Sequence, residues 1–297
     1  MNTINLPKKW SSWEITGEIG KGSSGTVYCM EKTTHNRTKR TALKVIELSA
    51  SSEKDIMMIS VFGQKEIVKN SLSERVEGYR NEIKMMETLR GCRHIVKILD
   101  HEILSEEDGL KWTIYIQMEY LQALPERLSS ENFSVDEVRR LGADICDALN
   151  ACERNGIIHR DIKPANIFWS EKDGYKLGDF GIACPAGESA VNTASTGTLN
   201  YMSPEIYHGK SFDQAVDIYA LGMILYRILN NGCGPFITVP EASAKRLTLR
   251  KAVTRRMDGE ELPAPASDSP LTDAVLKACR FDPKDRFQSA DLFKAAL

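Results

Sequence analysis

The chain has 297 residues, of which 42% are hydrophobic and 27% are charged, and its formal net charge is −2. Such a length and composition are typical of a globular protein with one large domain or two lobes. The nearly balanced charge argues against nucleic acid or an anionic membrane surface as a partner. The longest apolar run, near Ile218–Tyr226, is much shorter than the roughly 20 residues that a membrane span needs, and the start MNTINLPKKW resembles no export signal.

The chain contains seven scattered cysteines, and no two of them have CxxC spacing. An odd number without metal-ligand spacing argues against a disulfide framework or a zinc site. We therefore expect a reducing, cytoplasmic setting.

Strand-like alternation dominates the first hundred residues or so. The segments concerned are WEITGEIG, GTVYCMEK, RTALKVIEL, HIVKILDHEIL and KWTIYIQMEYL. One helix is expected among them, at about Glu74–Arg90, ending at Gly91. The segment Ser49–Ser73 has two interpretations. Its apolar residues either add packing against the smaller, strand-rich lobe, or they form a docking surface or a regulator that positions the following helix.

Long helices are expected after Leu121. Ser134 and Glu137 have the spacing of a capping box, and the helix that they begin should end at Asn155-Gly156. A second helix, Ala215–Leu229, is apolar on nearly every face, which indicates the centre of a helical lobe. Strands followed by helices predict two lobes with a cleft between them.

The stretch GIIHRDIKPANIFW, which starts at residue 156, places five polar residues between two apolar pairs. The pattern indicates a rigid loop, and phosphoryl transfer gives each polar residue a function. Asp161 could accept or orient the proton of an attacking hydroxyl, and Lys163 could hold the phosphoryl group by charge. Asn166 offers an oxygen ligand for Mg²⁺. His159 and Arg160 are expected to be architectural.

Three glycines in IGKGSSGTVY, at positions 20, 22 and 25, would let backbone amides approach phosphate oxygens. Dinucleotide-binding folds use similar glycines, but there the glycines begin a helix. Here the residues TVYCM continue as a β-branched strand. The pattern therefore favours a strand pair that covers phosphates over a dinucleotide-binding fold.

Two charged residues complete the pattern. Lys44 lies in the apolar stretch TALKVIEL, where a buried lysine needs a partner, and Glu82 is the best candidate. Alternatively, Lys44 is a solubilising residue on an edge strand. In KLGDFGIA, Asp179 follows a strand. Alone it would indicate a turn, but together with Asn166 it predicts two oxygen ligands for a shared Mg²⁺.

The motifs GKGSSGTV, ALKV, HRDIKPAN, DFG and SPE stand in this order, and the chain from about Trp13 to Leu297 resembles the eukaryotic-type protein kinase superfamily. The resemblance implies an α+β fold with a small antiparallel β-sheet lobe plus one helix and a larger, mainly helical lobe. The implied parts are an N-terminal extension (1–12) and a kinase domain (13–297). That domain comprises a small lobe (13–118, with an insert at about 49–73), a hinge (119–122) and a large lobe (123–297).

The resemblance also assigns roles. Lys44 would hold the α- and β-phosphates of ATP and Glu82 would hold Lys44, while Asp161 would be the catalytic base and Lys163 the γ-phosphate contact. The nucleotide-binding set would be Gly20, Gly22, Gly25, Val27, Ala42, Lys44, Met118, Glu119, Leu121, Asn166, Phe168 and Asp179. Asn166 and Asp179 would bind Mg²⁺, for which Mn²⁺ could substitute. Glu205 of SPE would pair with Arg286, and Asp217 would anchor the catalytic-loop backbone.

The implied activity is ATP-dependent transfer to serine or threonine of a protein substrate, because Lys163 and Thr198 match the serine/threonine branch. Ala165 stands where many arginine-directed relatives carry Glu, which argues against a strong preference for basic substrates. The segment Asp179–Glu205 offers candidate autophosphorylation sites at Ser189, Thr193, Ser195 and Thr196.

Two alternatives to a protein kinase are considered. The first is a pseudokinase scaffold, which would normally have lost one of the residues Lys44, Asp161, Asn166 or Asp179, and none is lost. The second is a small-molecule phosphotransferase, which would usually lack the SPE motif and its arginine partner.

Overall fold

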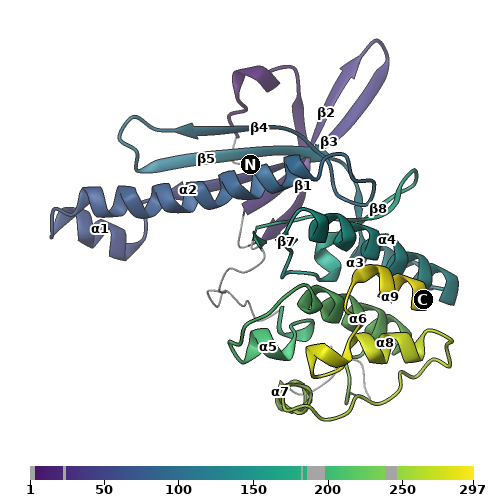
Figure 1. Ribbon diagram of the computed structural model, residues 1–297. Coiled ribbons are helices and arrows are strands. Elements are labelled where there is room, and N and C mark those ends of the chain that lie inside the picture. The colour runs from purple at the N-terminus through teal and green to yellow at the C-terminus, as the bar shows by residue number, and fades with distance from the viewer. Residues whose placement is uncertain (1–3, 23–24, 182, 186–197, 238–245) are drawn as a thin grey trace. The chain divides into compact units, whose positions relative to one another are not determined.

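The computed structural model describes residues 4–22, 25–181, 183–185, 198–237 and 246–297. The chain divides into two compact units. The first comprises Met1–Arg90 and Val96–Leu121, and the second comprises Gly91–Ile95 and Gln122–Leu297. Strands dominate the first unit and helices the second (Figure 1), so the predicted α+β class with two lobes is confirmed.

The first unit is built on a five-stranded antiparallel sheet with the order β1-β2-β3-β5-β4. Its strands are β1 (Glu14–Gly22), β2 (Gly25–Thr34), β3 (Arg37–Ser49), β4 (Ile98–Ser105) and β5 (Lys111–Glu119). All five predicted strands are present. Strand β4 begins at Ile98, later than expected, because Ile95 forms a bridge with Leu177 of the second unit instead.

One face of this sheet carries an apolar cluster that includes Trp10, Leu43, Val45 and Tyr115. Trp10 ends a short 3-10 helix that starts at Lys8. The indole is 3% exposed, and its ring lies edge-on to Tyr115 with the ring centroids 6.1 Å apart. The segment before residue 13 therefore contributes to the core of the first unit, where burial of an indole contributes a large apolar area.

The helices of the first unit differ from the prediction. Helix α2 (Lys65–Thr88) starts nine residues earlier than expected, and a second helix, α1 (Glu53–Ser60), precedes it. The longer α2 forms because Val68 and Leu72 extend the buried stripe of this helix beyond the segment judged from sequence. Ser52 begins α1 by accepting a hydrogen bond from the Asp55 N–H at 3.1 Å.

The insert exposes most of its large apolar side chains. Its exposed members are Ile56, Met57, Val61, Phe62 and Ile67, each more than half exposed. Packing against the smaller lobe, the first of the two interpretations of Ser49–Ser73, holds for the buried Val68 and Leu72 but not for these five residues. Figure 1 shows α1 beside the N-terminal end of α2.

The second unit is mainly helical. Its helices are α3 (Leu124–Ser130), α4 (Val135–Arg154), α5 (Pro204–Tyr207), α6 (Ala215–Leu229), α7 (Arg246–Met257), α8 (Thr272–Ala278) and α9 (Ala290–Ala296). Its strands are β6 (Gln122–Ala123), β7 (Ile157–Ile158), β8 (Ile167–Ser170), β9 (Gly174–Leu177) and β10 (Cys184–Pro185). Helix α6 has the predicted bounds and buries nearly all its side chains. None of the helices in the described ranges is long and apolar enough to cross a membrane.

Helix α4 confirms half of the predicted capping box. The Ser134 hydroxyl accepts a hydrogen bond from the Glu137 N–H at 3.2 Å. The Glu137 carboxylate does not reach back, because it accepts a 2.5 Å hydrogen bond from the Tyr175 hydroxyl and pairs with Arg127. At the other end Gly156 adopts a φ of 66°, a left-handed conformation that suits glycine at a helix terminus.

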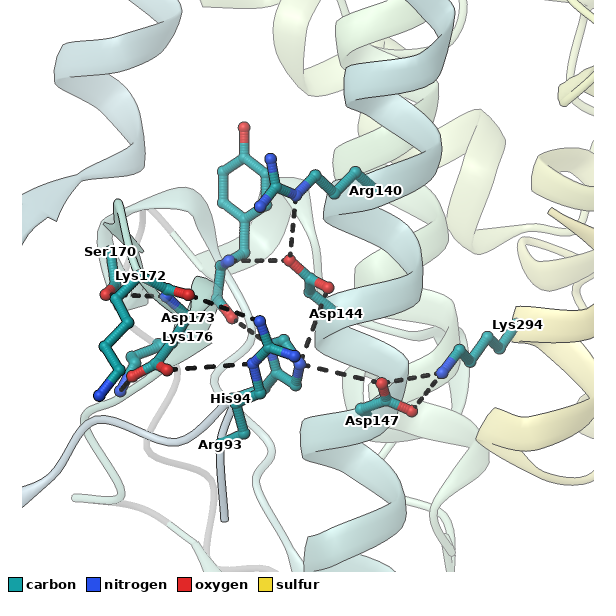
Figure 2. Close-up of polar contacts among 11 residues, drawn as sticks. Arg93, His94, Arg140, Asp144, Asp147, Ser170, Lys172, Asp173, Lys176 and Lys294 are labelled. Atoms are coloured by element: carbon teal, nitrogen blue, oxygen red, sulfur yellow. Dashed lines mark hydrogen bonds and ion pairs between the residues drawn. The ribbon is translucent and has the colours of Figure 1, made fainter.

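Segment 91–95 is held on the second unit by polar contacts with α4 and β9 (Figure 2). His94 donates from Nδ1 to the Tyr175 carbonyl at 2.8 Å, and its backbone carbonyl accepts from the Leu177 N–H at 2.8 Å. Asp144 accepts from the Tyr175 N–H at 2.9 Å. Burial raises the pKa of Asp144, and this N–H and the nearby His94 oppose the shift. These contacts hold the strand that leads into Asp179.

Candidate active site

One face of the sheet in the first unit collects much of the predicted nucleotide-binding set. The register aligns Gly20 with Val27, and Val27 with Lys44. Ala42, two positions before Lys44 on β3, pairs with Met118 of β5. Directly opposed residues share a face, and so do residues two apart on one strand. Pairing thus brings these five residues to one side of the sheet although they are spread over almost a hundred positions.

Gly25 is required by strand pairing. Its φ is 137°, and a Cβ there would lie 2.5 Å from the Val45 carbonyl oxygen. At Gly22, by contrast, a Cβ would meet no heavy atom of the described residues within 4 Å. The two glycines thus serve different purposes: Gly25 allows close approach of β3, whereas Gly22 leaves the backbone at the strand end uncovered.

Lys44 and Glu82 form the predicted ion pair. The Lys44 Nζ lies 3.1 Å from Glu82 Oε1, and the two side chains are 8% and 3% exposed. Two charges can stay this deeply buried only when each offsets the desolvation cost of the other. The interpretation of Lys44 as a solubilising edge residue is wrong, because β3 lies inside the sheet between β2 and β5.

The predicted hinge residues end the first unit. Glu119 closes β5, and its carboxylate accepts a hydrogen bond from the Lys97 N–H at 2.8 Å, while its own N–H donates to the Lys97 carbonyl at 3.1 Å. Leu121 is half-buried and is the last residue of this unit. Phe168 belongs instead to the second unit, where β8 pairs it with Ala123 and Lys176.

The segment from His159 to Asn166 in the second unit, named the catalytic segment here, places three predicted residues in mutual contact. Lys163 Nζ lies 2.6 Å from Asp161 Oδ2. The Asn166 amide donates to the Asp161 carbonyl at 2.8 Å and to Asp161 Oδ2 at 3.1 Å. The arrangement fixes the Asp161 carboxylate and places a cation beside it. It suits a carboxylate that accepts a proton or orients a hydroxyl.

His159 and Asp217 hold this segment in place through hydrogen bonds. Asp217, 3% exposed, accepts hydrogen bonds from the N–H groups of His159 and Arg160, both at 2.8 Å. Burial raises the pKa of the Asp217 carboxyl, and the His159 side chain and the two N–H donors oppose the shift. Arg160 has a φ of 64°, a strained conformation for a side chain of its size that the two anchored N–H groups help to impose.

The imidazole of His159 joins the two loops of the site. Nδ1 accepts from the Asp161 N–H at 3.3 Å, so Nε2 carries the hydrogen and donates to the Gly178 carbonyl at 3.1 Å. Its ring lies 4.7 Å from the Phe180 ring in an edge-on arrangement. Sequence reasoning assigned His159 an architectural role but not its two hydrogen bonds, because no local pattern specifies which backbone groups a buried imidazole contacts.

Asn166 and Asp179 fit a divalent metal ion. The Gly178 N–H donates to the Asn166 carbonyl at 2.9 Å, which ties the two loops together. Because the Asn166 amide nitrogen donates to Asp161, its oxygen remains as the ligand atom. Asp179 is half-buried with a φ of 59°, a conformation that Asp tolerates better than most residues. Oxygen donors of this kind suit Mg²⁺.

Glu205 and Arg286 form a two-point ion pair. The guanidinium donates to Glu205 Oε1 at 2.7 Å and to Oε2 at 2.8 Å, and both residues are buried. Ser203, two residues before Glu205, buries its hydroxyl, and within the described residues this oxygen has no hydrogen-bond partner. The predicted phosphosites Ser189, Thr193, Ser195 and Thr196, and the Thr198 side chain, lie outside the described part of the chain.

Comparison with known proteins places the chain in a family. A family model described as protein kinase domain matches residues 13–296. The serine/threonine-protein kinase PknB of Mycolicibacterium smegmatis is 38% identical over 196 residues, which cover 62% of this chain and 30% of the relative. PknB of Mycobacterium tuberculosis (strain H37Rv) is 37% identical with the same coverage. Aurora kinase of Saccharomyces cerevisiae is 27% identical over 293 residues, which cover 94% of this chain and 67% of the relative.

The chain thus spans about a third of the length of the PknB relatives that it matches. The relatives carry serine/threonine kinase or Aurora kinase names, which confirms the resemblance drawn from the five motifs. This chain belongs to the protein kinase family, in its serine/threonine branch.

Proposed function

We propose that this chain is an ATP-dependent serine/threonine protein kinase that transfers the γ-phosphate of ATP to serine or threonine hydroxyls of a protein. The contact that carries the proposal is the 2.6 Å pair of Lys163 Nζ and Asp161 Oδ2, with Asn166 bound to the same carboxylate. A carboxylate held in this way can orient the acceptor hydroxyl and receive its proton. Family membership supports the same activity.

Each predicted residue has a function in this reaction. Lys44, held by Glu82, binds the α- and β-phosphates, and Lys163 offers positive charge to the phosphoryl group in transfer. Asn166 and Asp179 hold Mg²⁺ or Mn²⁺, which supplies charge that offsets the phosphate oxygens. Gly20, Gly22 and Gly25 bring backbone amides to phosphate oxygens, while Val27, Ala42, Met118, Glu119, Leu121 and Phe168 contact the nucleotide base and sugar.

A protein substrate is favoured over a small molecule by the buried Glu205–Arg286 pair, because such a pair holds the end of the activation segment, Asp179–Glu205, in one conformation. The serine and threonine residues of that segment are proposed autophosphorylation sites, with a moderate effect on rate. The exposed apolar residues of Ser49–Ser73 are proposed as the contact surface of a regulatory protein. A cytoplasmic location is proposed from the scattered cysteines.

The activity is tested by replacing Asp161 with Asn. Transfer of γ-phosphate to a generic protein substrate should fall about 10²- to 10⁴-fold, the usual contribution of a positioned acid or base. Nucleotide affinity should change little, since Asp161 acts on the acceptor. Asp136→Asn, an exposed carboxylate on α4 whose side chain is 90% accessible, serves as the control.

Equal transfer by the wild type and Asp161→Asn would contradict the proposal. Magnesium-dependent ATP binding without transfer by either protein would favour the pseudokinase alternative.

A further inference from the structure

A polar cluster centred on His94 lies outside the catalytic segment and the metal ligands (Figure 2). Both ring nitrogens of His94 face oxygen atoms that accept hydrogen bonds. Nδ1 lies 2.8 Å from the Tyr175 carbonyl oxygen. Nε2 lies 3.8 Å from Asp144 Oδ1 and 3.9 Å from Asp147 Oδ2, two carboxylates one turn apart on α4. The imidazole thus stands between β9 and two negative charges.

These contacts favour the doubly protonated form of the imidazole. A carbonyl oxygen only accepts hydrogen bonds, so Nδ1 carries a hydrogen. In the neutral ring Nε2 would then point its lone pair at two carboxylates, whereas in the imidazolium it presents an N–H to them. His94 is 8% exposed, so little water is available to replace either contact. A second proton therefore turns two repulsive contacts into attractive ones.

Cations on α9 and α4 offset part of the negative charge that faces His94. Lys294 Nζ of α9 lies 2.6 Å and 2.8 Å from the two carboxylate oxygens of Asp147. Arg140 Nε of α4 lies 3.9 Å from Asp144 Oδ2. The charge that acts on the imidazole thus depends on the balance within these two pairs, and it can be changed from either side.

The other charged groups near the segment form a separate set. Arg93 Nε lies 3.9 Å from Asp173 Oδ1, and its guanidinium donates to the Lys172 carbonyl at 3.5 Å. Lys176 of β9 lies 3.1 Å from the other carboxylate oxygen of Asp173. With two cations for one carboxylate, this set opposes protonation of the imidazole. The favourable negative charge is therefore supplied by α4.

Strand β9 connects this cluster to the metal site. The His94 carbonyl accepts a hydrogen bond from the Leu177 N–H at 2.8 Å. The next residue, Gly178, donates its N–H to the Asn166 carbonyl at 2.9 Å, and Asp179 follows. The contacts of His94 therefore fix the end of β9 from which the chain enters the metal site.

We propose that doubly protonated His94 is a positioning residue, whose Nε2–H binds the carboxylates of Asp144 and Asp147 and so holds β9 with Asp179 in place for the metal ion. The inference rests on the proposed function, which assigns Asp179 to the metal. The state with β9 held in this way binds one proton more than the released state. It is therefore favoured at low pH and is lost as the pH rises through the titration of His94.

Asp144 sets the lower end of this pH range. Burial raises the pKa of its carboxyl, although the Tyr175 N–H, His94 and Arg140 oppose the shift. Its negative charge is therefore lost, as the pH falls, at a higher pH than that of an exposed aspartate. The contact should be strongest above this point and below the titration of the imidazole.

NMR titration of the histidines of the whole chain tests whether the carboxylates act on His94. Asp147→Asn should lower the midpoint of the His94 titration by about one pH unit, and Lys294→Gln should raise it, because each removes one charge of the pair beside the ring. His35, exposed in the turn after β2, is the internal reference. Lys277→Gln, an exposed lysine in the last turn of α8, is the matched control and should leave the His94 midpoint unchanged.

Binding of a non-hydrolysable ATP analogue with Mg²⁺, measured at about pH 6 and about pH 8, tests the connection to the metal site, because an imidazole changes charge between these values. The ratio of the two affinities in the wild type should exceed that in His94→Asn by about three- to tenfold. The asparagine amide can still donate to the Tyr175 carbonyl but cannot gain a proton, and protonation of the nucleotide itself cancels in the comparison.

The reciprocal measurement needs no phosphate transfer. Coupling between a proton and a second ligand acts equally in both directions. Saturation of the wild type with the magnesium analogue should therefore raise the His94 midpoint by about 0.5 to 1 pH unit, the same factor of three to ten. Melting temperatures check that each variant is folded.

Equal His94 midpoints in the wild type, Asp147→Asn and Lys294→Gln would overturn the inference, as would a His94 midpoint that the bound magnesium analogue leaves unchanged. A wild type that binds the analogue with the expected shift but transfers no phosphate would contradict the proposed function and uphold the role of His94. A wild type that does not bind the analogue with magnesium would contradict both.

Discussion

The catalytic segment from His159 to Asn166 and helix α1 are both short stretches with many apolar neighbours in sequence, but the structure treats them in opposite ways. In the catalytic segment every polar group described above has a partner, and the Asp217 carboxylate binds the backbone N–H groups of His159 and Arg160. Helix α1 contacts α2, and its apolar side chains Ile56 and Met57 are more than half exposed.

This difference separates two sources of order. The catalytic segment is held by hydrogen bonds to residues far away in sequence, so its geometry depends on the whole second unit. Helix α1, by contrast, is held by its Ser52 cap and by contacts with the neighbouring helix α2. Its apolar side chains Ile56 and Met57 remain accessible to solvent. A buried polar network is costly when broken, whereas an exposed apolar residue is nearly neutral to change.

Among the polar substitutions that test this comparison, Asp217→Asn is expected to have the largest effect on stability. An amide can accept from one of the two N–H groups of His159 and Arg160 but presents its own N–H to the other. One buried donor then loses its partner, which costs about 1–3 kcal/mol. Chemical denaturation measures the free energy of unfolding, and phosphate transfer should fall as well because Asp161 is displaced.

The matched control is Asp108→Asn, because Asp108 also accepts a backbone N–H, from Leu110, but in an exposed turn. If both substitutions change the free energy of unfolding equally, burial of the catalytic segment is not what makes its anchor important.

A smaller effect of opposite sign is expected for Ser203→Ala. The buried hydroxyl has no hydrogen-bond partner within the described residues, so its removal should stabilise the fold by about 1 kcal/mol. Ser134→Ala should instead destabilise by about 1 kcal/mol, because that hydroxyl caps α4. Thermal unfolding of the two variants compares a serine with a partner and one without.

The smallest effect on stability is expected for the exposed apolar residues of the insert. The double variant Ile56→Ser, Phe62→Ser should change the free energy of unfolding by no more than about 0.5 kcal/mol per site. Leu72→Ala, which truncates a buried side chain of α2, should cost about 2–5 kcal/mol. A cost in the double variant close to that of Leu72→Ala would show that the exposed surface is covered in solution.

Contacts between near neighbours in the chain could be predicted from the residues alone. Asp161, Lys163 and Asn166 lie within six positions, so their spacing already indicated a shared site. The apolar character of α6 specified both of its ends, because a helix buried on all faces leaves little choice of boundary. The two ion pairs Lys44–Glu82 and Glu205–Arg286 were predicted as well, although the second followed from the family resemblance.

Only the tertiary structure decided the rest. It shows that Gly25 is required by the Val45 carbonyl, that Glu137 pairs with Tyr175 and Arg127 instead of completing its capping box, and that the insert exposes its apolar residues. It also brings His94 to the carboxylates of Asp144 and Asp147. Each of these depends on which distant segments pack together, and packing is determined by the complete set of buried surfaces, which no short window of sequence contains.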